Sequence, residues 1–175
     1  MRAALDAIYR VSGLAAGFFL VGIAALSLAQ VGGRLLGRAT HSYDEFAGYC
    51  MAASSFLGLA WTLRCNEHIR LTLLLGRLQG QWRRVSELAC LAVAAAITAY
   101  FAWSTVAMVW TSFELNDVSQ GLVPVKLWIP QSAMALGLVI LLLAFVDDLV
   151  AGISGRMLSY HAAQPGKGEA VAFER

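Results

Sequence analysis

The chain has 175 residues, of which 59% are hydrophobic and 14% are charged, and its mean hydropathy is +0.66. Soluble domains carry about 25% charged residues, so this composition excludes an ordinary soluble protein and indicates a membrane protein. The formal net charge of +2 is too small to indicate that the chain binds nucleic acid.

Four uncharged apolar stretches are each long enough to cross a bilayer as a helix. They cover residues 11–33, 46–63, 88–113 and 127–146. We therefore predict an all-α fold, in which residues 1–151 form a transmembrane domain with four membrane-spanning helices. Residues 152–175 are polar and small, with several glycines and a proline, and this composition predicts a flexible cytoplasmic tail.

The first stretch also resembles a secretory signal, because Arg2 and Arg10 precede its apolar run. It is 23 residues long, whereas the apolar part of a signal has roughly 7–15 residues. We interpret it as a retained first span, and a cleaved signal is the alternative.

The loop between the second and third spans carries leucines and a tryptophan at helical spacing, with arginines seven residues apart on another face. The apolar positions are Leu71, Leu74, Leu75, Leu78 and Trp82, and the arginines are Arg70, Arg77 and Arg84. This pattern predicts a short amphipathic helix over residues 68–83 that lies at the membrane interface, with its arginines towards the phosphate groups of lipids.

The lysines and arginines predict the orientation of the chain. If both termini are cytoplasmic, ten of the 13 basic residues lie on the cytoplasmic side and three, namely Arg34, Arg38 and Lys126, lie on the opposite side. Because cytoplasmic loops of membrane proteins carry an excess of positive charge, we predict that both termini are cytoplasmic.

No aspartate, glutamate, lysine, arginine or histidine lies within the four apolar stretches. A transporter that binds ions itself usually places such groups near mid-membrane. The serines and threonines within the stretches are expected to bond back to their own helices. The chain therefore lacks the groups needed to drive transport alone, and a self-sufficient small exporter is disfavoured.

The histidines and cysteines give no sign of a cofactor. His41, His68 and His161 lie outside the stretches and share no metal-ligand spacing, whereas a haem anchor needs histidines on facing helices. The three cysteines form no CxxC pair, and the chain has no nucleophile motif or phosphate-binding loop. We predict that the chain is not an enzyme and holds no cofactor.

Small residues spaced four apart recur in the spans. The pairs are Gly13 with Gly17, Gly48 with Ala52, Ser54 with Gly58, and Ala92 with Ala96. Such pairs let helix backbones approach closely within a membrane. We predict that they pack helices against one another or against a larger partner.

Two motifs distinguish this sequence from other membrane proteins with four spans. The first begins with Asp44-Glu45 and continues with residues 58–64 (GLAWTLR) and 67–70 (EHIR). The second consists of residues 121–124 (GLVP) and 127–131 (LWIPQ), followed by Gly137. Together they resemble the small membrane subunit of tripartite ATP-independent periplasmic (TRAP) transporters, and the second motif looks like the family's entry into its fourth helix. Lys126 departs from the family pattern.

The resemblance implies a membrane scaffold in the bacterial inner membrane. The expected partners are a large permease subunit, which carries the substrate and sodium sites, a periplasmic binding protein, which delivers an organic acid, and membrane lipids. The alternative function is the membrane anchor subunit of a respiratory or redox complex, which the missing intramembrane histidines disfavour.

Charged residues at the ends of the spans are the predicted contacts with partners or lipid. Those on the periplasmic side, which could form an acidic edge for the binding protein, are Asp44, Glu45, Glu114 and Asp117. Those at the inner end of the second span, which could hold the large subunit or lipid, are Arg64, Glu67, His68 and Arg70. The alternatives are favourable charge at a helix N-terminus for the first set and a positive-inside anchor for the second.

Overall fold

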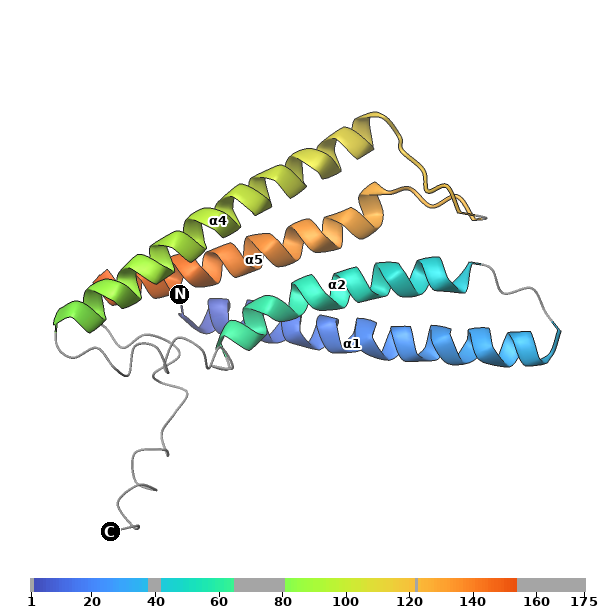
Figure 1. Cartoon of the computed structure of the whole chain (residues 1–175), viewed down its shortest axis with the longest axis horizontal. Coiled ribbons are helices and arrows are strands. Elements are labelled where there is room, and N and C mark those ends of the chain that lie inside the picture. The colour runs from blue at the N-terminus through green and yellow to red at the C-terminus, as the bar shows by residue number, and fades with distance from the viewer. Residues whose placement is uncertain (1, 38–41, 65–80, 122, 154–175) are drawn as a thin grey trace, which may run out of the picture.

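The computed structural model describes residues 2–37, 42–64, 81–121 and 123–153. They form four helices, labelled as in Figure 1: α1 (Arg2–Leu35), α2 (Tyr43–Arg64), α4 (Gln81–Glu114) and α5 (Trp128–Ile153). Each helix is long and apolar enough to cross a membrane. The predicted all-α fold with four spans is therefore confirmed.

The helices extend past several of the predicted span ends. The apolar part of α1 begins at Leu5, and α5 continues to Ile153, so Gly152 and Ile153 belong to a helix and not to a tail. A helix does not stop where the hydrocarbon stops, because its ends can project beyond the lipid. Of the predicted interfacial helix, residues 81–83 are the first residues of α4. The remainder of that prediction, and residues 154–175, lie outside the described residues.

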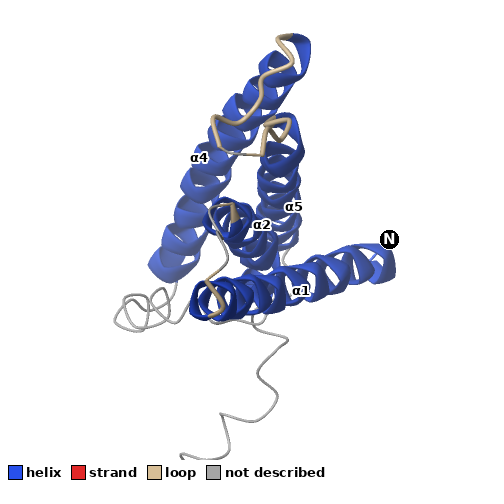
Figure 2. Cartoon of the chain, turned by 90° about the vertical axis from the view of Figure 1, so that its right-hand side faces the viewer, coloured by secondary structure: helices blue, strands red, loops and turns tan. Residues whose placement is uncertain are grey.

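The helices pack in an order that differs from the sequence. α1 packs on α2, α2 on α5, and α5 on α4, so that α1 and α4 stand at the two ends of the assembly (Figure 2). Successive helices run in opposite directions, which brings the start of α1 and the end of α5 to the same end (Figure 1). The other end holds residues 117–121 and 123–127 and the first turn of α2, and we call it the hairpin end (Figure 1).

A Schellman motif ends α4. Asn116 has a positive φ of 52°. Its N–H donates to the Phe113 carbonyl (3.3 Å), and the Asp117 N–H donates to the Ser112 carbonyl (3.1 Å). These two bonds satisfy carbonyls that the end of a helix leaves unpaired, and asparagine tolerates the left-handed conformation that the motif requires.

The chain then folds back as a short hairpin that leads into α5. The Ser119 N–H donates to the Val125 carbonyl (2.8 Å), and the Leu127 N–H donates to the Asp117 carbonyl (3.0 Å). Pro130 follows in the first turn of α5, where a helix needs no N–H donor. The hairpin therefore sets the turn between two antiparallel spans.

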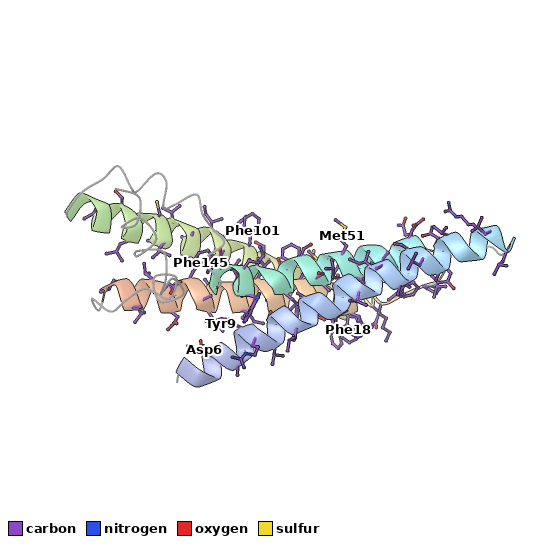
Figure 3. The ribbon with its side chains drawn as sticks, turned by 90° about the horizontal axis from the view of Figure 1, so that it is seen from below. Asp6, Tyr9, Phe18, Met51, Phe101 and Phe145 are labelled. Carbon is purple, nitrogen blue, oxygen red and sulfur yellow. The ribbon has the colours of Figure 1, made fainter. Side chains whose placement is uncertain are left out.

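Tyr9 is the centre of the buried core. It is 1% exposed and is the largest fully buried side chain among the described residues. Figure 3 shows it on the side of α1 that faces the other helices, whereas Phe18 projects away from them. The remaining core residues come from α1, α2 and α5: Ala16, Ala53, Leu57, Ala60, Leu63, Ile140, Leu141 and Ala144. Most of them are small or aliphatic, which lets the three helices lie close together.

Candidate functional site

Helix α2 is held closely by α5 at Gly137. A Cβ atom at position 137 would lie 2.5 Å from the carbonyl carbon of Phe56 and 2.6 Å from its oxygen. These are backbone atoms, so they cannot turn aside as a flexible side chain can. Gly137 is thus the point at which α5 touches the backbone of α2.

Helix α1 approaches α2 from another side through Gly13 and Ala16. A Cβ at position 13 would lie 2.8 Å from Cγ of Trp61, so only glycine leaves room for the indole ring. Gly58 lies opposite Ala16, and a Cβ at position 58 would be in ordinary contact at 3.6 Å. The α1–α2 contact therefore uses Gly13, Ser54 and Gly58 of the residues predicted to pack helices.

Two serines link α1 to α2 by hydrogen bonds. The Ser12 hydroxyl donates to the Leu57 carbonyl (2.5 Å), and the Ser54 hydroxyl donates to the Ala16 carbonyl (2.9 Å). The expectation that serines bond back to their own helix is wrong for this pair. It holds for Thr62, Thr105, Thr111 and Ser132, whose hydroxyls donate to carbonyls three or four residues earlier.

Removing both serine hydroxyls should loosen the α1–α2 pair. Hydrogen bonds between membrane helices contribute on average about 0.6 kcal/mol and at most about 1.7 kcal/mol. We expect Ser12→Ala and Ser54→Ala each to lower the free energy of unfolding in detergent by an amount in that range. Ser55→Ala is the control because Ser55 is exposed. Equal stability of the Ser12 and Ser55 variants would contradict the interpretation.

Two of the predicted packing glycines do not contact a neighbouring helix. A Cβ at Gly17 or at Gly48 would meet nothing within 4 Å. Ala52, the partner of Gly48 in its pair, is half-buried. The GxxxG formed by Gly13 and Gly17 therefore contributes only its first glycine to the packing of this chain.

At the hairpin end, Glu45 joins the start of α2 to the α4–α5 hairpin. The Tyr49 hydroxyl donates to Oε1 of Glu45 (2.6 Å), and the buried Ser119 side chain also hydrogen-bonds the carboxylate. The carboxylate lies directly against Gly121, where it leaves no space for a side chain. We call Glu45, Tyr49, Ser119 and Gly121 the latch, because they connect two segments more than 70 residues apart in the sequence.

The other residues of the predicted acidic edge have different surroundings. Asp44 is exposed beside Glu45 in the first turn of α2. Glu114 accepts a hydrogen bond from Nε1 of Trp110 (2.8 Å), and the backbone of Asp117 belongs to the hairpin. The structure thus directs Glu45 inward and leaves Asp44 at the surface. The contact with a binding protein stays a prediction.

The latch should protect the hairpin from opening. We expect Glu45→Ala to speed up hydrogen–deuterium exchange of the Ser119 and Leu127 amides, because the hairpin then loses its bonds to α2. Asp44→Ala is the matched control, since Asp44 is the exposed neighbour. The same exchange rates in the wild-type chain and in the Glu45 variant would show that the hairpin holds without the latch.

A buried carboxylate at the opposite end was not predicted. Asp148 on α5 is 3% exposed and lies, with Asp147, inside the apolar span Trp128–Ile153. Asp6 similarly lies inside the apolar span of α1. The four apolar stretches themselves contain no carboxylate, but the helices extend past them and carry these aspartates near their ends. The sequence does contain a sign of this buried position. Ala144, Asp148 and Ala151 are spaced so that they share one helix face, and apolar residues resume at Leu149.

The depth of Asp148 decides what this carboxylate implies. It follows Trp128 by 20 residues, which corresponds to about 30 Å of helix. That distance equals the thickness of a bilayer core, roughly 30 Å, so Asp148 lies at its edge and not at mid-membrane. A carboxylate in that position does not resemble an ion-binding group at the centre of a transporter.

The comparison with known protein families identifies the kind of membrane protein. The family model of the DctQ component of tripartite ATP-independent periplasmic transporters matches residues 23–155, which is more than half of the 175-residue chain. The chain belongs to this family. No curated protein and no solved structure matches this chain. The resemblance inferred from the two sequence motifs is thereby confirmed, and the DctQ subunit is a TRAP small permease component.

The matched range contains most of the contacts described above. In this DctQ subunit, the latch, Gly137 with Phe56, and Asp148 all fall between residues 23 and 155. DctQ is a family of transporter components and not a class of enzymes. The redox anchor proposed as the alternative function is not supported by this family, and all three histidines lie outside the described residues.

The inner cluster predicted at the end of the second span is only partly described. Arg64 is the last residue of α2 in the DctQ subunit, and its side chain is outside the described part. Glu67, His68 and Arg70 also lie outside the described residues. Their contact with the large subunit or with lipid stays a prediction.

Proposed function

We propose that this DctQ subunit is a non-catalytic scaffold that braces the large permease subunit during sodium-coupled uptake of an organic acid. A periplasmic binding protein delivers the acid, and the large subunit carries the substrate and sodium sites. The chain itself needs no cofactor in this role. It lies in the inner membrane, in contact with lipids, with both termini in the cytoplasm.

The proposal rests on the close contacts that α2 makes on both of its sides. Gly137 places α5 against the backbone of α2 at Phe56, and one residue later the Leu57 carbonyl accepts the hydrogen bond from Ser12 of α1. Lipid supplies no hydrophobic drive for helix association, so such backbone contacts and hydrogen bonds are what make a membrane unit rigid. A rigid unit suits a subunit that stays still while its partner moves.

The proposed orientation has two supports. Ten of the 13 lysines and arginines fall on the cytoplasmic side when both termini are placed there. The alternating helix directions put the start of α1 and the end of α5 on one side (Figure 1). The latch then faces the periplasm, where a binding protein would arrive.

The proposal is tested by measuring uptake with and without this chain. Cells that express the large subunit and the binding protein should accumulate a radiolabelled organic acid only when the DctQ subunit is present. The amount of large subunit in the membrane is measured in parallel, which separates a loss of transport from a loss of the protein. Full uptake in cells without the DctQ subunit would refute the scaffold function.

A further inference from the structure

Helix α4 turns one face away from the rest of the chain. It packs on α5 through the buried Leu91, Ala95 and Ala102, and it stands at one end of the assembly (Figure 2). Six exposed residues line the opposite face at alternating spacings of three and four. We call them the α4 seam: Val93, Ala96, Tyr100, Trp103, Ala107 and Trp110.

Two aromatic residues of the seam lie at mid-membrane depth. Trp110 and Phe113 stand near the hairpin end of the span Leu88–Glu114, where aromatic rings favour the headgroup level. Tyr100 is ten residues from Trp110 along the helix, which is about 15 Å. This is half the thickness of a hydrocarbon core of roughly 30 Å. Trp103 lies two residues from the middle of the same span, so both Tyr100 and Trp103 are too deep to reach the headgroups.

The polar atoms of these two side chains need a partner. Tyr100 is 70% exposed and Trp103 is 78% exposed, and neither hydrogen-bonds to any residue that the structure describes. Trp110, by contrast, donates from Nε1 to Glu114 within α4. Lipid hydrocarbon offers no acceptor, so a donor at this depth has to be satisfied by protein. The Tyr100 hydroxyl and the Trp103 Nε1–H accordingly mark a protein contact.

The exposed face of α1 shows what a lipid-facing surface looks like in the same chain. Val11, Leu14, Phe18 and Val21 recur there at the same spacing of three and four, and all are exposed. Their side chains are pure hydrocarbon, which lipid solvates fully. The spacing is the same on the exposed faces of α1 and α4, so it does not distinguish them. The polar atoms of Tyr100 and Trp103 do distinguish the α4 face. The small Ala96 and Ala107 beside the seam aromatics also permit close approach of another helix.

We propose that the α4 seam packs against a transmembrane helix of the large permease subunit. That helix supplies hydrogen-bond acceptors at mid-membrane to Tyr100 and Trp103. The inference rests on the proposed function for the existence of the partner, and it adds which surface of this chain the partner covers.

Photocrosslinking tests the assignment directly. The photoreactive residue p-benzoylphenylalanine replaces Trp103 in one variant and Phe18 in another, with the large subunit co-expressed. The two positions are matched, because both are aromatic and are 78% and 75% exposed. The Trp103 variant should form an adduct with the large subunit, and the Phe18 variant should not.

Other crosslinking results would contradict either the seam assignment or the scaffold function. An adduct at Phe18 but not at Trp103, an adduct between two copies of this chain, or crosslinking at Trp103 to lipid alone would overturn the seam assignment. In all three cases co-purification of the two subunits would leave the scaffold function intact. Failure of the subunits to co-purify, together with uptake that does not need this chain, would refute the scaffold function itself.

A second experiment removes only the polar atoms. The double variant Tyr100→Phe with Trp103→Phe keeps aromatic rings at both positions. It should lower the fraction of large subunit retained during detergent purification by about tenfold, or about threefold for each hydrogen bond. Phe18→Leu is the control and should leave retention unchanged. Wild-type retention by the double variant would contradict the proposed hydrogen bonds.

Discussion

Replacing Gly137 with leucine is expected to prevent the DctQ subunit from packing α5 against α2. Even the first added carbon would lie 2.5 Å from the Phe56 carbonyl carbon, so the two helix backbones must separate. Overpacking of a core typically costs about 1–3 kcal/mol and sometimes more. Here the obstacle is backbone, so we expect a loss at or above the upper end of that range. Thermal unfolding in mild detergent measures it, and transport should be lost in parallel.

Gly48→Leu is the matched control for this prediction. Gly48 is also a glycine within a span, but a Cβ there would meet nothing within 4 Å. The substitution should leave the unfolding temperature close to that of the wild-type chain. Equal destabilisation by the two leucines would mean that helix insertion, and not the α2–α5 contact, is sensitive to the added side chain.

Truncation of Tyr9 to alanine is the second change with a large expected effect. Tyr9 is 1% exposed and lies among core residues from α1, α2 and α5. Removing a buried aromatic ring costs about 3–5 kcal/mol, because the cavity left behind collapses only partly. We expect Tyr9→Ala to lower the free energy of unfolding by about that amount in a denaturant titration in detergent. Tyr9→Phe separates the contribution of the hydroxyl from that of the ring.

Val11→Ala is the corresponding control. Val11 lies two residues from Tyr9 on the same helix and is 65% exposed. Its truncation removes surface that faces outward and should leave stability nearly unchanged. A comparable loss in the Val11 and Tyr9 variants would show that the core around Tyr9 is not what holds α1 in place.

The number and type of the helices could be predicted because length and hydropathy alone determine a membrane span. The ends could not be predicted as well. Asp147 and Asp148 interrupt the apolar run of the fourth span, yet the helix continues through them to Ile153. Asp148 is tolerated because it lies on the buried face of α5 near the edge of the bilayer core, and its burial depends on neighbouring helices that the local sequence does not reveal.

The sequence predicted which types of residue pack the helices together, but not which residues of the neighbouring helix they contact. Gly13 and Gly17 form one GxxxG motif, but only Gly13 lies against Trp61. The choice depends on which face of α1 meets α2, and spacing within one helix carries no such information. The bond from Ser12 to Leu57 was missed for the same reason, since a serine in a span can equally bond back to its own helix.

The latch depends on contacts that are distant in the sequence. The acidic start of α2 was recognised as a candidate contact, but Ser119 and Gly121 were not assigned to Glu45. Nothing near Glu45 in the sequence points to a hairpin more than 70 residues later. Only the parallel arrangement of α2 and α5, which both begin at the hairpin end, together with the tight turn after α4, brings the two segments together (Figure 1).

The order of the helices in space constrains the order in which the subunit can be built. α1 and α2 are adjacent in the chain and can associate as soon as both have entered the membrane. α4 enters next, but the surface on which it rests belongs to α5, which is synthesised after it. Until α5 has entered the membrane, α4 lacks the helix against which it packs, and its aromatic side chains are exposed. If the large subunit is already in the membrane, the contact proposed for the α4 seam can form before α5 covers the other face of α4.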